Sequence, residues 1–232
     1  MKIKHGMILA AGLGKRMQPL TNKKPKPLLE IGGITLLERA INLLINHGVK
    51  EISVNIHHLG DQIEKYISDL KSEVKIKISN EKDLLLDTGG GVKKGTKDFK
   101  ENPFFVINPD TLWSNKYSEE VQSLEKEYFT NKRPCLLLVK KELSLDNSFK
   151  GDFNLNNNLI SKDEHNQFIF TGLQIIKNDH LVSFNKDIFS MNEVWAKLIS
   201  EKNLGGLESN QKFYHLNTFE MFEKISSLSS ID

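Results

Sequence analysis

Short apolar runs alternate with amphipathic segments through the first 140 residues, and this alternation constrains the fold more than any other feature of the chain. The first run, "HGMILAAG", is bounded by glycine and is typical of a strand buried on both faces. The segment "TLLERAINLLINHG" then carries its leucines and isoleucines on one helical face, between Thr35 and Gly48, which are typical N-cap and C-cap residues. Strand, loop and helix in this order form one unit of an α/β fold.

The alternation continues to about residue 140. It predicts strands at "VKEISVNI", "VKIKIS", "PFFVIN" and "PCLLLVK", with helices at "GDQIEKYISDL", at about 90–99 and around 118–129. Short connections between such elements predict a Rossmann-like, mostly parallel sheet with helices on both faces. Because the loops that leave the carboxyl ends of parallel strands lie along one edge, a ligand is expected at that edge.

After Lys140 the regular alternation of strands and helices ends. "FKGDFNLNNNLISKD" is typical of a hairpin, "QFIFTGLQIIKN" predicts one or two further strands, and "MNEVWAKLISEKN" predicts a helix with Trp195 in the core. No Pro-rich or Ser-rich linker separates these elements from the preceding ones. We therefore expect one domain over residues 1–232, in which a smaller α+β part (141–232) packs beside the active edge of the first part (1–140).

The loop after the first strand concentrates positive charge. Residues 9–29, "LAAGLGKRMQPLTNKKPKPLL", contain no acidic residue, although the whole chain carries 32 Lys and Arg against 30 Asp and Glu, a net charge of +2. A nearly neutral chain is not expected to bind nucleic acid, so the local cluster predicts a small anionic ligand. Gly12 and Gly14 allow backbone amides to converge, and three prolines stiffen the segment. The positive residues are Lys15, Arg16, Lys23, Lys24 and Lys26.

Two common phosphate-binding motifs do not match this loop. "GLGKRM" lacks the third glycine of the dinucleotide fingerprint, and no Lys-Ser or Lys-Thr pair follows a glycine as in a Walker loop. An NAD-dependent dehydrogenase, which also begins with strand, glycine loop and helix, is therefore disfavoured.

The segment "LAAGLGKRMQPLTNKKPKPLLEIGG" closely resembles the signature of the sugar-phosphate nucleotidyltransferases. The resemblance extends to "LLLDTGGGV", which is similar to a base-binding segment found in N-acetylmuramic acid 1-phosphate uridylyltransferases, and to "NPD", "GDF" and "FTGLQII". Mannose-1-phosphate guanylyltransferases are also similar. The resemblance implies the nucleotide-diphospho-sugar transferase fold, with a nucleotide-binding part (1–140) and a sugar-binding part (141–232). It also implies the reaction: an NTP, UTP being favoured, and a sugar 1-phosphate give an NDP-sugar and pyrophosphate.

The residue types suit this reaction. The nucleophile is a phosphate oxygen whose second pKa lies near about 6, so it needs no general base at neutral pH. The obstacle is repulsion between two polyanions, which Arg, Lys and Mg²⁺ can offset. The resemblance assigns phosphate contacts to Arg16 and Lys26 as catalytic residues, nucleotide binding to Ala11, Gly12, Gly14, Lys15 and Gly89, and sugar binding to Gly151, Asp152, Thr171 and Gly172.

The resemblance also implies a Mg²⁺ site, with Asp110 as an oxygen ligand. Two residues depart from the family pattern there. His215 in "FYHLNT" stands where the family has a second magnesium-binding Asp, and Pro109 replaces the glycine of N-G-D. Imidazole suits softer metals than Mg²⁺, so His215 is a candidate ligand with Mn²⁺ as an alternative metal.

Two functional hypotheses stay open at this point. The first is an active sugar-1-phosphate nucleotidyltransferase; the second is a nucleotide- or sugar-nucleotide-binding protein of the same fold that has lost turnover. Guanylyltransferase or phosphocholine cytidylyltransferase-type specificity is a further alternative. The sugar and the oligomeric state are not predicted.

Two features favour a cytoplasmic protein without a membrane partner. The N-terminal apolar run reaches glycine too soon for a signal peptide or a membrane span. The single cysteine, Cys135, lies inside a predicted strand and is expected to be a packed core residue.

Overall fold

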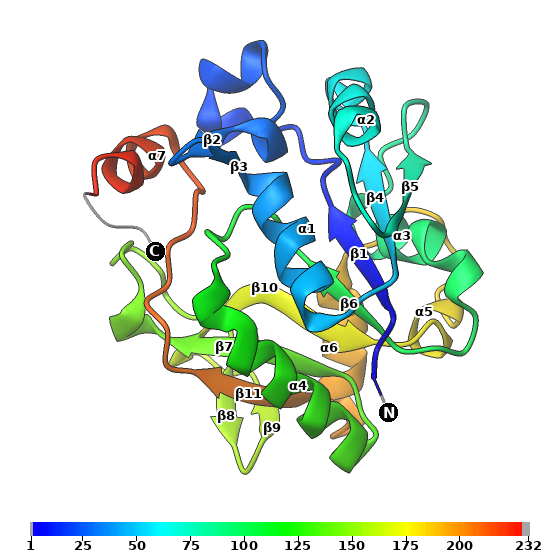
Figure 1. The fold of residues 1–232 in the computed structure, drawn as a ribbon. Helices are drawn as coiled ribbons and strands as arrows, with labels where there is room; N and C mark the ends of the chain where they lie inside the picture. Colours follow the sequence, from blue (N-terminus) through cyan, green and yellow to red (C-terminus); the bar gives the residue numbers. More distant parts are fainter. Residues whose placement is uncertain (1, 229–232) are drawn as a thin grey trace.

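A nine-stranded sheet lies at the centre of the computed structural model, which describes residues 2–228 (Figure 1). In spatial order its strands are β5 (Lys75–Asn80), β4 (Glu51–Ile56), β1 (His5–Leu9), β6 (Phe104–Ile107), β10 (Phe168–Ile176), β7 (Cys135–Lys140), β11 (Gly205–Ser209), β9 (Leu159–Ser161) and β8 (Asn154–Asn156). A separate two-stranded ribbon consists of β2 (Glu30–Ile31) and β3 (Ile34–Thr35).

The pairing confirms the predicted mostly parallel α/β sheet. β5, β4, β1 and β6 run parallel to one another, and so do β7 and β11. The long strand β10 is antiparallel to both of its neighbours, β6 and β7. The last third of the chain therefore does not lie wholly beside the sheet as expected, because β10 and β11 are inside it. β10 is apolar and buried along nearly its whole length, as an inner strand must be when helices cover both faces.

Helices cover both faces of the sheet (Figure 1). α1 (Leu36–His47), α2 (Gly60–Asp69) and α4 (Ser118–Asn131) pack on one face, whereas α3 (Asp87–Gly95), α5 (Asp179–Val182) and α6 (Met191–Ser200) pack on the other. Successive side chains of β1 point to opposite faces of the sheet. Ile8 packs in the hydrophobic core under α1, α2 and α4, and Met7 packs in the core under α3, α5 and α6. α7 (Phe219–Ser226) joins a third, smaller core with the β2–β3 ribbon.

Several local predictions are confirmed. The Thr35 hydroxyl accepts a hydrogen bond from the Glu38 amide at 3.0 Å, and Gly48 ends α1 with a φ of 106°. Trp195 and Cys135 lie in the core, and burial raises the pKa of the Cys135 thiol. Across residues 2–228, no helix combines the length and the apolar composition needed to cross a bilayer.

The predicted helix at about 90–99 is observed three residues earlier, as α3 followed by a short 3-10 turn (Lys97–Phe99). Its first turns contain Gly89, Gly90 and Gly91, which are poor helix formers. All three glycines pack closely against neighbouring groups, so tertiary packing overrides their low helix propensity.

Candidate functional site

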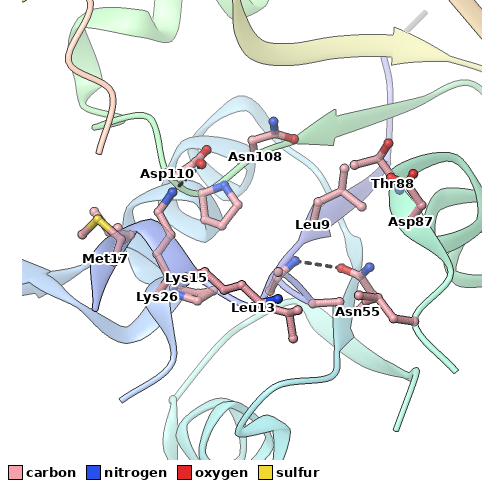
Figure 2. A pocket seen from close by; sticks show the side chains of 18 of the residues that line it. Leu9, Leu13, Lys15, Met17, Lys26, Asn55, Asp87, Thr88, Asn108 and Asp110 are labelled. Atoms are coloured by element: carbon pink, nitrogen blue, oxygen red, sulfur yellow. Dashed lines mark hydrogen bonds and ion pairs between the residues drawn. The ribbon is translucent and has the colours of Figure 1, made fainter. Parts of the chain in front are cut away.

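The carboxyl ends of four parallel strands open into one cavity of about 640 Å³. The loop after β1 supplies residues 9–17, β4 supplies Asn55, the turn after β5 supplies Glu81, and the loop after β6 supplies residues 108–110. Figure 2 shows Lys26 and Asp110 at one end of this cavity and Leu9, Asn55, Asp87 and Thr88 at the other. The cavity therefore lies at the edge where the sequence predicts a ligand.

The glycine loop after β1 is held in a compact turn. Gly14 has a φ of 63°, and its carbonyl accepts hydrogen bonds from the Met17 amide and the Thr21 hydroxyl, both at 2.8 Å. A Cβ at Gly14 would lie 2.9 Å from Thr21, whereas a Cβ at Gly12 would meet nothing within 4 Å. Gly12 thus keeps the backbone open to the cavity, while Gly14 makes the turn.

Lys15 and Arg16 follow this turn in a short 3-10 helix (Lys15–Met17) and are exposed. Neither side chain has a hydrogen bond or an ion pair with another residue in the described part of the chain. Their charges are available to an anion in the cavity, which both residues line together with Ala11.

Lys26 and Asp110 meet across the cavity. The Lys26 Nζ lies 2.7 Å from the Asp110 Oδ2, and the His215 Nε2 approaches the same oxygen to 3.2 Å. Burial by itself would raise the pKa of Asp110, but the charges of Lys26 and His215 outweigh that effect and hold this pKa well below its usual range. Asp110 is therefore an ionised acceptor at neutral pH.

The loop that carries Asp110 is fixed from behind by a bulge in β10. The Asn108 amide donates to the Gly172 carbonyl at 2.8 Å, and the Thr111 hydroxyl donates to the Thr171 carbonyl. The pairing of β10 with β7 shifts register here, between Phe170 and Gln174. Pro109 lines the cavity with its two neighbours, so the proline leaves Asp110 facing the cavity.

The other end of the cavity is organised by two buried polar side chains that sequence reasoning missed. The Asn55 Oδ1 accepts from the Ala10 amide at 2.7 Å, and its Nδ2 donates to the Glu81 Oε1 at 2.7 Å. The Glu81 Oε2 accepts from the Leu86 amide at 3.0 Å. These bonds tie the glycine loop to the start of α3. Both residues stand at the ends of predicted strands, which is the signal that would have identified them.

Gly89 is one of the residues expected to bind the nucleotide. It does not line the cavity, its amide donates to the Phe189 carbonyl at 2.8 Å, and a Cβ there would collide with the Phe189 ring. Gly89 is a packing glycine, and its neighbours Asp87 and Thr88 face the cavity in its place.

The four residues expected to bind sugar do not line the cavity either. The Asp152 Oδ2 accepts from the Phe170 amide at 2.9 Å, and Gly151 packs against the Asn166 backbone. The buried Thr171 hydroxyl donates to the Leu137 carbonyl at 2.9 Å. Thr171 and Gly172 shape the β10 bulge, so they support the Asp110 loop instead of facing the cavity.

The segment around His215 differs from expectation in a similar way. The His215 ring forms a three-ring cluster with Phe149 and Phe213, each with a centroid distance of 5.7 Å from it, and it is not part of the cavity lining. Asn217 lines the cavity instead. No group of three or more His, Cys, Asp and Glu side chains within residues 2–228 is arranged to hold a metal ion.

Asn217 is held by Asp146. Its Nδ2 donates to the Asp146 Oδ2 at 2.9 Å. Burial would raise the pKa of Asp146, but hydrogen bonds from Ser148 and Asn217 outweigh it and lower that pKa.

Comparison with known proteins identifies the family to which similar sequences belong. Residues 5–142 match the family model described as nucleotidyl transferase. The chain is 30% identical over 221 residues to the N-acetylmuramate alpha-1-phosphate uridylyltransferase of Caulobacter vibrioides, covering 92% of this chain and 91% of that protein. It is 38% identical over 118 residues to the enzyme of the same name from Neisseria meningitidis, covering 50% of this chain and 51% of that protein.

Solved structures share the fold. A UDP-glucose pyrophosphorylase in complex with UDP-glucose superposes with a TM-score of 0.80 at 18% identity, over 97% of both chains. HddC from Yersinia pseudotuberculosis, complexed with GMP-PN, superposes with a TM-score of 0.78 at 21% identity, over 97% of this chain and 98% of that one.

Proposed function

The chain belongs to the nucleotidyl transferase family, and from that premise we propose that it uses UTP and a sugar 1-phosphate of the N-acetylmuramic acid type. It is a sugar-1-phosphate nucleotidyltransferase, which makes an NDP-sugar and pyrophosphate. The preference for uridine is supported by the relatives that are uridylyltransferases and by Thr88 of "TGGG", which faces the cavity. Such a product would be a precursor of cell-wall or other polysaccharide.

One observation carries the proposal: the glycine loop, the cations Lys15 and Arg16, whose side chains have no partner within residues 2–228, and the Lys26–Asp110 pair converge on one cavity. In the reaction an oxygen of the sugar phosphate bonds to the α-phosphorus, and the bond from that phosphorus to the β-phosphate oxygen breaks. Both reactants are anions, so catalysis requires positioning and charge neutralisation more than proton transfer.

Each cation has a defined role in this proposal. Arg16 binds phosphate oxygens through its planar guanidinium and stabilises the departing pyrophosphate. Lys26, which packs beside Gly14 of the glycine loop, bridges the α-phosphate and the incoming sugar phosphate. The backbone at Gly12 approaches the triphosphate because no side chain stands there.

The carboxylate of Asp110 suits the binding of a hard divalent cation in the cavity. The Asp110 Oδ1 is buried and has no hydrogen-bond donor among the described residues, which suits a cation ligand. When bound beside Asp110, Mg²⁺, or Mn²⁺ in its place, would offset phosphate charge. We propose that the protein is located in the cytoplasm, because its single, buried cysteine, Cys135, suits a reducing compartment. We expect no nucleic-acid or membrane partner.

The test is pyrophosphate release in a grid of UTP, GTP, CTP and dTTP against the 1-phosphates of N-acetylmuramic acid, N-acetylglucosamine, glucose and mannose. UTP with N-acetylmuramic acid 1-phosphate is expected to give the fastest release. Arg16→Ala should abolish most of it, whereas Lys126→Ala, which removes an exposed lysine of α4, should leave it unchanged. Faster pyrophosphate release with another pair would replace the substrates proposed here. No release with any pair would overturn the proposal.

A further inference from the structure

The backbone places Asn217 beside the loop that carries Asp110. The Leu216 amide donates to the Asp110 carbonyl at 2.8 Å, and the Leu112 amide donates to the Tyr214 carbonyl at 2.9 Å. This short antiparallel pairing brings the next residue, Asn217, into the cavity lining with only 8% of its surface exposed.

The orientation of the Asn217 amide follows from its partner. The oxygens of a carboxylate accept hydrogen bonds and do not donate them, so the amide atom 2.9 Å from the Asp146 Oδ2 is the donor, the Asn217 Nδ2. Asp146 is itself fixed by the amide and the hydroxyl of Ser148, at 2.9 Å and 2.6 Å from its Oδ1. The Asn217 Oδ1 is therefore the end of the amide that has no hydrogen-bond partner within residues 2–228.

Two buried oxygens of the cavity lining thus lack a donor. Among the described residues, neither the Asp110 Oδ1 nor the Asn217 Oδ1 receives a hydrogen bond. A buried acceptor without a partner destabilises the protein, and a cation that binds both oxygens would remove this penalty at both positions. One carboxylate oxygen and one amide oxygen are ligand types that Mg²⁺ accepts, with phosphate oxygens and water in its remaining positions.

We propose that the Asn217 Oδ1 is the second protein ligand, beside the Asp110 Oδ1, of the divalent cation that accompanies the nucleotide. The inference rests on the proposed function. It moves the ligand position two residues along the chain from His215, where the family resemblance places it. His215 is then a positioning residue.

The geometry of His215 supports that role. Its Nε2 lies 3.2 Å from the Asp110 Oδ2, the oxygen that Lys26 also contacts. The imidazole packs against two phenylalanine rings, Phe149 and Phe213, which also contact each other, and this cluster restricts its rotation. Together Lys26 and His215 occupy one carboxylate oxygen and leave the other for a cation.

The first experiment measures Mn²⁺ affinity by the loss of the free-ion EPR signal, for the whole protein alone and with UTP but no sugar phosphate. Asn217→Ala is expected to weaken Mn²⁺ binding by about tenfold or more, and Asp146→Ala to weaken it similarly by freeing the amide. Asp146→Asn keeps one acceptor oxygen for the donors of Asn217 and Ser148, so it should recover part of the affinity that Asp146→Ala loses. Asn108→Ala removes another amide of the cavity lining and should leave the affinity within about threefold.

A spectroscopic measurement on the wild-type protein does not depend on the folding of any variant. Pulsed EPR of bound Mn²⁺ should detect coupling to the side-chain carbonyl carbon of isotopically labelled asparagine, and no directly bound nitrogen. Directly bound nitrogen would identify His215 as the ligand and overturn the inference.

Other results separate this inference from the proposed function. Unchanged Mn²⁺ affinity in Asn217→Ala, with a higher KM for the sugar phosphate, would mean that the Asn217 Oδ1 accepts a hydrogen bond from the sugar-phosphate substrate. That result would overturn this inference and leave the proposed function intact. No Mn²⁺ binding with or without UTP would overturn it as well, and pyrophosphate release would then decide whether the proposed function stands.

Discussion

The Lys26 Nζ lies 2.7 Å from the Asp110 Oδ2, although 84 positions separate the two residues in the sequence. Lys26 begins a 3-10 turn (Lys26–Leu28) in the basic loop, and Asp110 follows β6. Their side chains are 15% and 24% exposed, so the pair faces the cavity while water reaches it only in part. Lys26, proposed to bind phosphate, and Asp110, proposed to bind a metal ion, neutralise each other's charge in this structure.

Replacement of Lys26 by methionine should lower kcat/KM for both substrates by about a hundredfold to a thousandfold, as removal of a charge that stabilises a transition state typically does. Lys26→Arg should retain part of the activity, since the charge stays but its position shifts. Steady-state pyrophosphate release is the measurement. Activity close to wild type in the methionine variant would show that this lysine does not contact the reacting phosphates.

The depressed pKa of Asp110 predicts a pH dependence of stability. Its pKa is lower in the folded state than the value near about 4 of an unfolded chain, so the ionised carboxylate stabilises the fold above that pH. This contribution is lost as the pH falls through the folded pKa. Urea unfolding from about pH 7 down to about pH 3 should therefore lose less stability in Asp110→Asn than in the wild type. Parallel curves for the two proteins would contradict the assignment.

Gly89→Ala and Gly12→Ala separate packing from binding. A Cβ at Gly89 collides with Phe189, so we expect a loss of about 1–3 kcal/mol in the free energy of unfolding, measured by urea titration. A Cβ at Gly12 meets no atom within 4 Å, so that variant should fold with nearly unchanged stability and bind UTP more weakly. If Gly89→Ala kept its stability and lost only UTP affinity, the original assignment of Gly89 to the base would be restored.

Thr111→Val tests how the Asp110 loop is held. The variant keeps the side-chain shape but removes the hydroxyl that donates to the Thr171 carbonyl. We expect a loss of about 1–2 kcal/mol in stability and a lower kcat, because the loop that carries Asp110 gains freedom. Thr111→Ser retains the donor and should keep most of the activity. Equal kcat values in both variants would mean that the bond does not position Asp110.

Local patterns predicted most of the elements of this fold. The spacing of apolar residues identified α1, α2 and α4 and the strands β1, β4, β5, β6 and β7. These elements follow from periodicity and from caps such as Thr35, which depend on residues close in sequence. The insertion of β10 between β6 and β7 was not predicted, because strand order depends on contacts between distant segments.

For the site, local sequence was enough to predict the glycine loop, the cations Lys15, Arg16 and Lys26 and the anion Asp110 as cavity residues, because one contiguous motif and one strand end carry them. Which of their neighbours face the cavity depends on tertiary packing. It turned Gly89 toward Phe189, placed Thr171 and Gly172 behind the Asp110 loop, and brought Asn55 and Glu81 together. The direction of a side chain at a strand end depends on the bulges, turns and packing around it, and those arise from residues far away in the chain.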